Sequence, residues 1–258
     1  MKKEYYYDLH CHTTLSPDAP LTVKKLVRMA KKRGLDGVAI TNHNKVYKGP
    51  VNIDGIDIIP GSEIDVKERV HLLAYFIESK IDEDKNFREA IEDIHQQKGV
   101  AVWAHPLRKE GVLENNKEVF NIIDGLESGN AMDLKSHQKK VEMICENENL
   151  LQIAGSDAHV EGQVGMAVIK VREKLTKENF KEVVKSGEII IRKEVDDFRT
   201  SDQVWKKRLD YFFQKKRIQE FKFFKNICSK LILRNYLRIN NIHLKKISFS
   251  YKNDGEEI

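Results

Sequence analysis

The chain has 258 residues and a mass of 30.0 kDa, which is enough for one large domain with an appended segment. No apolar run approaches the roughly 18 residues that span a bilayer. The charged start MKKEYYY also lacks the apolar stretch of a signal peptide, so we expect a cytoplasmic protein without a transmembrane segment. The three cysteines form no close-spaced pair, which argues against a disulfide framework and against a CxxC zinc module.

The net charge of +5 is unevenly distributed along the chain. Residues 196–258 hold 15 Lys and Arg against 8 Asp and Glu, a net charge of +7, which leaves −2 for residues 1–195. The basic character therefore belongs to the C-terminal segment.

Up to about residue 195, short apolar runs alternate with amphipathic segments, the pattern of βα units and a largely parallel sheet. The predicted strands are YYYDL, GVAIT, IDIIP, VHLLAYF, VAVWA, IIDGLE and LQIAG, and the predicted helices cover residues 21–33, 86–98, 117–121, 135–147 and 177–185. Thr22 and Thr176 are the expected N-caps, and glycines 34, 99 and 187 the expected stops. Seven strands in fewer than 200 residues favour a small barrel over an open sheet.

The stretch YYYDLHCHTT places two histidines at the end of an aromatic run that reads as a strand. Residues two apart on a strand share a face, so His10 and His12 point together and Cys11 points away from them. Neutral imidazole is the commonest metal ligand. The pair is therefore either half of a metal site or two histidines satisfied by backbone groups.

Polar residues recur where the predicted strands end. His71 opens or interrupts an apolar run, and the others follow or close one: His10, His12, His43, Glu63, His105, Glu127, Asp157 and His159. In an α/β barrel the C-terminal strand ends converge on one mouth, so we expect these side chains to meet there. Imidazole and carboxylate without thiolate suit Zn²⁺, Mn²⁺ or Fe²⁺.

Two further polar residues, Glu127 and Arg108, are each compatible with two roles. Glu127 in GLESG is either an outer group that orients a metal ligand or a simple loop carboxylate. Arg108, just after AHP, is either a bidentate clamp for a phosphate or an exposed loop arginine.

The motifs DLHCHTTLSPD, GLDGVAITNHN, GSEID, VHLLAYF, AHP and GSDAH occur in this order between about residues 5 and 195. In them the chain resembles the PHP (polymerase and histidinol phosphatase) superfamily of metal-dependent phosphoesterases. The resemblance implies a distorted (β/α)7, TIM-like barrel over residues 1–195, with a trinuclear metal centre at its mouth. Residues 196–258 then form a separate basic, aromatic-rich extension.

The resemblance also implies how the ligands divide among the metals. The first metal takes His10, His12, Glu63 and Asp157; Glu63 bridges to a second held by His71 and His105; and the third takes Asp18, His43 and His159. Family members usually read Thr-Asp-His where this chain has Thr-Asn-His, so a carboxylate is missing at Asn42. Pro17 also lengthens the usual spacing before Asp18.

The implied activity is hydrolysis of a phosphoric ester by metal-activated hydroxide attack on phosphorus. Glu63, as the bridging carboxylate, and Arg108, as a phosphate clamp, are assigned catalytic roles. For His159 and His43, protonation of the leaving alkoxide competes with the ligand role. We expect a phosphomonoester or nucleotide-like substrate. The alternatives are an exonuclease-like phosphodiesterase on nucleic acid and a non-catalytic metal-binding regulatory module.

The segment from Gln203 to Ile247 interleaves 13 Lys and Arg with aromatic residues at helical spacing. Three interpretations remain open: helices packed on the barrel with solvated lysines, a surface for nucleic acid, or a basic helix lying on an anionic membrane.

Overall fold

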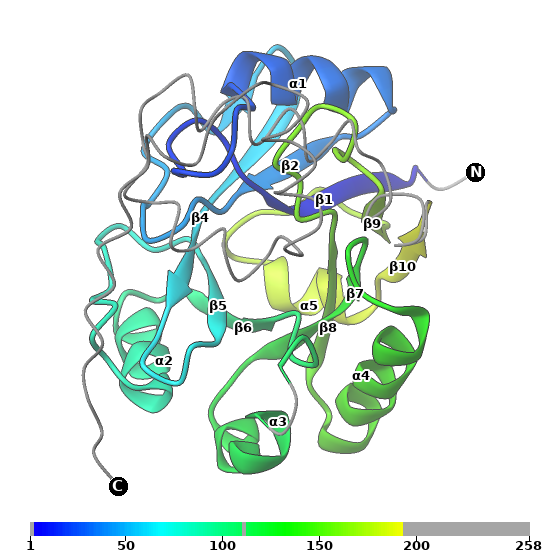
Figure 1. The fold of residues 1–258 in the computed structure, drawn as a ribbon. Helices are drawn as coiled ribbons and strands as arrows, with labels where there is room; N and C mark the ends of the chain where they lie inside the picture. The colour runs from blue at the N-terminus through cyan, green and yellow to red at the C-terminus, as the bar shows by residue number, and fades with distance from the viewer. Residues whose placement is uncertain (1–2, 110–111, 193–258) are drawn as a thin grey trace, which may run out of the picture. The chain divides into compact units, whose positions relative to one another are not determined.

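The computed structural model describes residues 3–109 and 112–192, and its strands form one sheet that curls into a nearly closed barrel (Figure 1). The strands are β1 (Tyr5–Cys11), β2 (Gly37–Ile40), β3 (Asn52–Ile53), β4 (Ile56–Asp65), β5 (His71–Tyr75), β6 (Val100–Ala104), β7 (Gly125–Asn130), β8 (Leu151–Gly155), β9 (Ala167–Val171) and β10 (Glu188–Ile191). Their order is β10-β9-β1-β2-β4-β5-β6-β7-β8, with β3 paired to β4. The predicted barrel class is confirmed.

The strand directions differ in part from the largely parallel sheet that the sequence pattern predicted. β1, β2 and β4 are parallel, as are β6, β7 and β8, but β5 is antiparallel to both β4 and β6. A direct hairpin joins β4 to β5 without an intervening helix, and β9 lies antiparallel to β1 and β10. The sequence pattern placed no helix between β4 and β5, but it predicted neither the reversed direction of β5 nor the strands β3, β9 and β10.

The barrel closes at its mouth, because the segment after β8 pairs with the end of β1. The His12 N–H donates to the Ala158 carbonyl over 2.8 Å, and the Ala158 N–H donates to the His10 carbonyl over 3.3 Å. Two motifs about 150 positions apart in sequence are thereby brought side by side.

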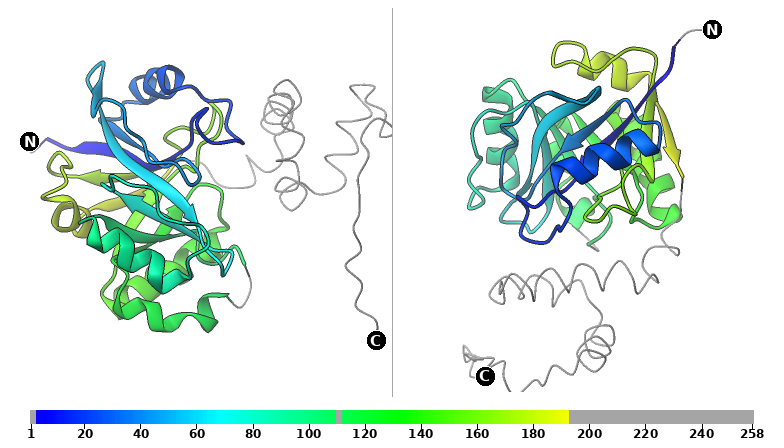
Figure 2. Two further views of the ribbon diagram at one scale, coloured as in Figure 1. Left: turned by 90° about the vertical axis from the view of Figure 1, so that its left-hand side faces the viewer. Right: turned by 90° about the horizontal axis from the view of Figure 1, so that it is seen from above.

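The helices are α1 (Val23–Lys32), α2 (Phe87–Gln96), α3 (Val112–Asn115), a 3₁₀ helix η1 (Lys117–Asn121), α4 (Lys135–Glu148) and α5 (Phe180–Lys185). α1, α2 and α4 lie outside the sheet (Figure 2), each burying a stripe of apolar residues against it. No helix in residues 3–109 and 112–192 is long and apolar enough to cross a bilayer.

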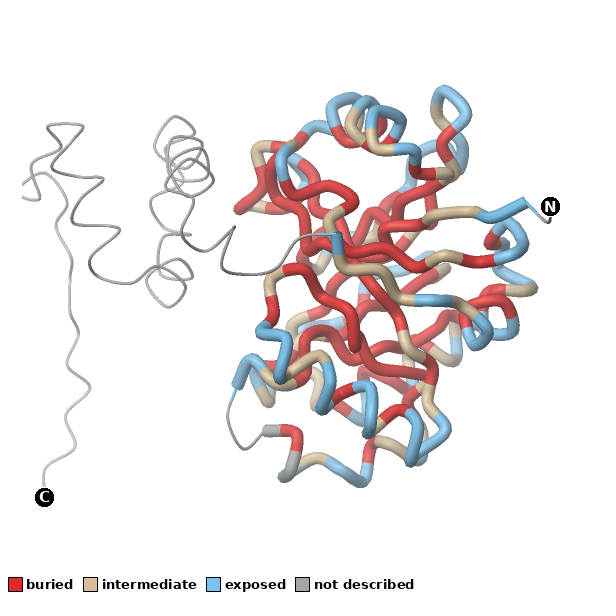
Figure 3. Tube along the Cα trace, turned by 90° about the vertical axis from the view of Figure 1, so that its right-hand side faces the viewer, coloured by how far each residue is buried: buried red, intermediate tan, exposed pale blue. Residues whose placement is uncertain are grey.

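Three apolar clusters hold the barrel together, and Figure 3 shows buried residues concentrated at the centre of the barrel and exposed residues in the outer segments. One cluster fills the interior around Tyr7, Leu73 and Tyr75, and α5 contributes Phe180 to it. The second lies beneath α2 and α4, and the third beneath α1. The barrel interior away from the mouth is thus packed with apolar side chains, and the polar groups gather at the mouth.

One predicted cap is confirmed and one is wrong. The Lys25 N–H donates to the Thr22 hydroxyl over 3.3 Å at the start of α1. The last helix begins at Phe180 rather than near Lys177, because Thr176 and Asn179 bond to each other in a preceding turn. The predicted extension 196–258, with Cys228, His243 and the barrel boundary at 195, lies outside the described residues.

Asp124 joins three elements at the end of the barrel opposite the mouth. Its Oδ2 lies 2.9 Å from His95 Nε2 of α2 and accepts the Ala101 N–H of β6 over 2.8 Å, and its Oδ1 accepts a bond from Lys181 of α5. Burial by itself raises the pKa of Asp124, but the bonds from His95 and Lys181 hold that pKa below its usual range.

We expect Asp124→Asn to lower the free energy of unfolding by about 1–3 kcal/mol at pH 7 without changing turnover. Because the folded-state pKa is lowered, the contribution is complete above the unfolded pKa near 4 and is lost as pH falls through the folded value. Urea unfolding of both proteins at pH 7 and in the acid range measures this difference. A difference that grew as pH fell would contradict the assignment.

Candidate metal centre

The two histidines of the HCH motif meet inside the barrel mouth. The register of β1 shifts between Asp8 and Cys11, and His10 Nε2 lies 3.1 Å from His12 Nε2, both side chains being fully buried. Cys11 packs instead in the cluster beneath α1, as expected. Gly155 is the last residue of β8 and packs against His10. A Cβ atom added to Gly155 would lie 2.2 Å from the His10 Cβ, so no other residue fits there.

Glu63, on β4, is the hub of the site, because its two carboxylate oxygens face different histidines. Oε1 lies 2.8 Å from His71 Nδ1 and 3.0 Å from His105 Nε2. Oε2 lies 3.1 Å from His12 Nε2 and 3.4 Å from both His10 Nε2 and His43 Nδ1. This is the arrangement that a bridging carboxylate requires.

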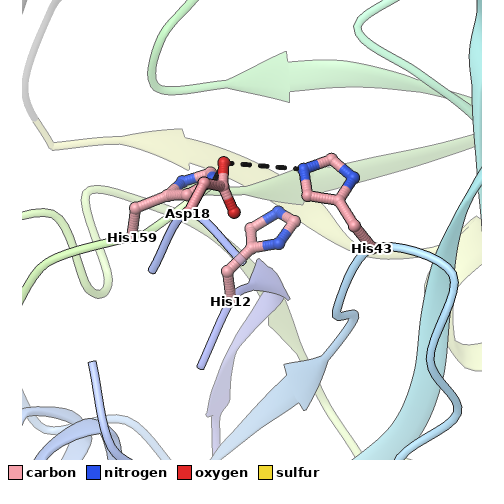
Figure 4. A group of neighbouring side chains, drawn as sticks. All are labelled: His12, Asp18, His43 and His159. Carbon is pink, nitrogen blue, oxygen red and sulfur yellow. Dashed lines mark ion pairs between the residues drawn. The ribbon is translucent and has the colours of Figure 1, made fainter. Parts of the chain in front are cut away.

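A second group of ligand atoms gathers beside the first, on loops after β1, β2 and β8. His12, Asp18, His43 and His159 point toward one another (Figure 4). Asp18 Oδ2 lies 2.9 Å from His159 Nε2 and 3.7 Å from His43 Nε2. His43 therefore faces both this group and Glu63.

Asp157 completes the first group, with Oδ1 3.3 Å from His12 Nε2 and 3.6 Å from His10 Nε2. Asp157 and His105 both have positive φ angles, 53° and 33°, which non-glycine residues rarely adopt. Such strained backbone clusters at functional sites, where the surrounding structure holds it in place.

In several histidines, the ring nitrogen that faces away from the centre of the cluster contacts another oxygen of the protein. This contact fixes how the ring presents its other nitrogen to the centre. Nδ1 of His10 lies 2.9 Å from Glu127 Oε1, Nδ1 of His12 lies 3.1 Å from Ser16 Oγ, Nε2 of His71 lies 3.1 Å from Asp65 Oδ1, and Nδ1 of His159 lies 2.8 Å from the Asp157 carbonyl. Metal-binding histidines almost always have such an outer partner.

The charges in the cluster are strongly coupled. Burial lowers the pKa of His12, but the Asp157 and Glu63 carboxylates outweigh it and raise that pKa to about 9. Burial raises the pKa of Glu63, yet the imidazoles of His43 and His71 hold it well below its usual range. The site thus keeps buried carboxylates ionised among imidazoles, and bound cations would take over from protons in balancing them.

The donor set fits divalent metal ions. Ligand atoms about 2.0–2.2 Å from one ion lie about 2.8–3.6 Å from each other at angles of 90–109°. The Nε2 atoms of His10 and His12 lie 3.1 Å apart, and each lies 3.1–3.6 Å from Glu63 Oε2 and from Asp157 Oδ1. Imidazole and carboxylate ligands with no thiolate suit Zn²⁺, Mn²⁺ or Fe²⁺, as the composition of the motifs predicted.

Asn42, where the family pattern has an aspartate, directs its side-chain oxygen at Thr13 and Ser16. Its Oδ1 accepts bonds from the Thr13 N–H over 2.7 Å, the Thr13 hydroxyl over 3.0 Å and the Ser16 hydroxyl over 3.2 Å. Ser16 Oγ in turn lies 3.1 Å from His12 Nδ1 and accepts the His43 N–H over 2.9 Å. The residue at position 42 thus acts as an acceptor that orients Ser16, a role that the amide oxygen fills.

We expect Asn42→Ala to weaken metal binding by about tenfold or more, because Ser16 loses the acceptor that orients it toward His12. Asn42→Asp restores an acceptor of the same shape and is expected to recover most of this loss. Chelator competition followed by elemental analysis measures both variants. Equal loss in both would show that position 42 needs the amide itself.

The remaining predicted residues are placed as follows. Glu127 bonds to His10, which agrees with the outer role suggested by the sequence. Arg108 bonds to Asp157, and the phosphate-clamp role stays a prediction. His95 binds Asp124 instead of the cluster.

Sequence reasoning missed several polar residues of the site: Ser16, Asp65, Asn130 and Asp133. Asp65 follows Glu63 by two positions on the same strand, so the rule that joined His10 to His12 would have found it.

A barrel in which imidazoles and carboxylates converge at the C-terminal ends of the strands is suited to a metal-dependent enzyme. Residues 8–195 match the PHP domain, and the chain belongs to this family, as the motifs predicted. It is 30% identical over 140 residues to an uncharacterised protein of Methanocaldococcus jannaschii, covering 48% of this chain and 81% of that one. It is 25% identical over 228 residues to a probable phosphatase of Caldicellulosiruptor saccharolyticus, covering 74% of this chain and 93% of the relative.

Solved structures share the fold at lower identity. PsfC from Pseudomonas syringae has a TM-score of 0.61 at 16% identity over 73% of this chain and 92% of its own. A Bacteroides vulgatus protein containing a predicted PHP-like metal-dependent phosphoesterase gives 0.58 at 20% identity, over 73% and 65%. A lesion-specific endonuclease from Pyrococcus furiosus gives 0.55 at 18% identity, over 72% and 58%. These structures share the fold, and the family match and the relatives named as probable phosphatases confirm the predicted class of metal-dependent phosphoesterase.

Proposed function

We propose that this protein hydrolyses a phosphomonoester of a small molecule or nucleotide, using two or three divalent metal ions, of Mn, Zn or Fe, at the barrel mouth. The observation that carries the proposal is Glu63, whose two oxygens face separate sets of histidines. The naming of several relatives as probable phosphatases supports the substrate class.

The proposed ligand groups are those that the family resemblance implies, although proximity also groups His43 with Glu63 and His71. His10, His12, Asp157 and Glu63 hold one ion, and Glu63, His71 and His105 a second. Asp18, His43 and His159 hold a third, with His43 also within reach of Glu63. When bound, such ions supply hydroxide at neutral pH and neutralise charge on the phosphoryl oxygens.

The substrate approaches from the side of His71. The side chains of His10 and His12 are fully buried, whereas that of His71 is 20% exposed and those of His43 and His105 are 9% exposed. His159 lies beside Asp18, where its Nε2 serves as a ligand or passes a proton to the leaving alkoxide. These two roles for His159 predict different results: loss of the ligand lowers metal content, whereas loss of the proton donor chiefly slows substrates with poor leaving groups.

Purified protein supplied with Mn²⁺ or Zn²⁺ tests the proposal. We expect turnover of p-nitrophenyl phosphate and nucleoside monophosphates to exceed that of bis(p-nitrophenyl) phosphate by tenfold or more. Preferential cleavage of the diester or of an oligonucleotide would favour the alternative, a phosphodiesterase on nucleic acid. The fold shared with the endonuclease and the basic residues beyond 195 are what support that alternative.

The basic extension has its own test. Neutralising Lys215, Lys216, Arg217, Lys222 and Lys225 together should leave turnover of a small phosphomonoester almost unchanged. If the extension binds single-stranded nucleic acid, the slope of log affinity against log salt flattens by up to about 3, since each lost phosphate contact removes about 0.7. An unchanged slope would remove nucleic acid as its partner and leave packing or an anionic membrane, which liposome co-sedimentation separates.

A further inference from the structure

The guanidinium of Arg108 is already occupied by three protein acceptors. Nε donates to Asp133 Oδ1 over 2.6 Å, Nη1 to Asp157 Oδ2 over 2.7 Å and Nη2 to Asn130 Oδ1 over 2.7 Å. These acceptors come from the end of β7, the loop after it and the segment after β8. Three of the five N–H groups of the arginine are thereby donated within the protein.

We propose that Arg108 is a positioning residue that holds the Asp157 carboxylate in place for a metal ion, instead of a clamp for the substrate phosphate. The inference rests on the proposed metal centre. Asp157 uses its two oxygens differently: Oδ2 accepts from Arg108, and Oδ1 faces the inner nitrogens of His12 and His10 at 3.3 and 3.6 Å. The arginine therefore fixes the carboxylate from its outer side.

The same arginine reaches a second ligand through Asn130. Asn130 Oδ1 accepts from Arg108, and its Nδ2 donates to Glu127 Oε2 over 2.9 Å. Glu127 Oε1 lies 2.9 Å from His10 Nδ1, and its Oε2 also accepts the His105 N–H over 2.9 Å. One side chain thus sets the orientation of Asp157 directly and that of His10 through three successive hydrogen bonds, by way of Asn130 and Glu127.

The charge of Arg108 is matched inside the protein. The side chains of Asp133 and Asp157 are 5% and 8% exposed, so both carboxylates need a nearby cation. Asp133 lies outside the metal groups, and its bond to Nε holds the plane of the guanidinium. Planar, multiply bonded arginine cannot be replaced by lysine without losing this geometry.

The two roles predict different results for Arg108→Lys and Asp133→Ala. A positioning role predicts that both variants lose about 10–100-fold in metal affinity, measured by chelator competition and elemental analysis. It also predicts a lower kcat in both, with KM for p-nitrophenyl phosphate and the inhibition constant of inorganic phosphate changing less than threefold. Arg28→Lys is the matched control, because Arg28 bonds Glu161 on the outer surface over 2.6 Å.

Two results would overturn the inference. A phosphate inhibition constant that rises tenfold in Arg108→Lys, with metal affinity unchanged, would show a phosphate clamp. Unchanged metal affinity in both variants, with circular dichroism showing them folded, would show that the bonds do not serve the metal site. Wild-type protein that holds no metal would instead refute the proposed function, and this inference with it.

Discussion

Glu63→Gln is expected to remove metal binding and turnover together, with turnover falling by about 100-fold or more. The amide keeps the volume of the side chain but loses the charge and one of the two acceptor oxygens. In the protein those oxygens face His71 and His105 on one side and His12, with His10 and His43, on the other. Elemental analysis and steady-state kinetics on the same preparation measure both effects.

His95→Gln and His137→Gln are the matched controls for this variant. His95 bonds Asp124 at the opposite end of the barrel, and His137 lies on the outer helix α4. Both should keep turnover within a few-fold of wild type. Full metal content and turnover in Glu63→Gln would mean that the bridging position has been misassigned.

Removing metal from the wild-type protein should lower its melting temperature by about 10 °C or more. Ions that bind only the folded state stabilise it by about 4 kcal/mol at a free concentration 1,000 times the dissociation constant, and each kcal/mol shifts the melting temperature by about 2–4 °C at this chain length. Without ions, the buried carboxylates Glu63 and Asp157 rely for charge compensation on imidazoles and, at Asp157, also on Arg108. Differential scanning calorimetry with and without EDTA measures the shift.

The same scan on Glu63→Gln serves as the control, because a protein without the bridge should show a much smaller change on chelation. An equal shift in both proteins would place the stabilising ions elsewhere. No shift in the wild type would show that the cluster holds itself together without metal.

Much of the site was predictable because strand ends are easy to recognise in sequence. His10, His12 and Glu63 close apolar runs, and a barrel has to bring such ends to one mouth. Two-residue spacing on a strand also predicted correctly that His10 and His12 share a face while Cys11 does not.

The rest depended on contacts that no local pattern encodes. The direct hairpin from β4 to β5 reverses the strand direction without any change in the apolar pattern, so the sequence did not show that β5 runs antiparallel in a largely parallel sheet. Arg108 finds its three acceptors on segments up to 49 positions away, and sequence spacing cannot show that they meet. Asn42 departs from the family pattern in sequence, but its contacts show that it supports Ser16.

The central claim is that a multinuclear metal centre at the barrel mouth hydrolyses phosphate esters. Elemental analysis of protein purified without added metal, combined with p-nitrophenyl phosphate turnover on the same sample, tests it most directly. We predict at least two equivalents of metal per chain, and hydrolysis that is lost on chelation and restored by Mn²⁺ or Zn²⁺. Fewer than one equivalent, with no activity restored by either ion, would contradict the claim.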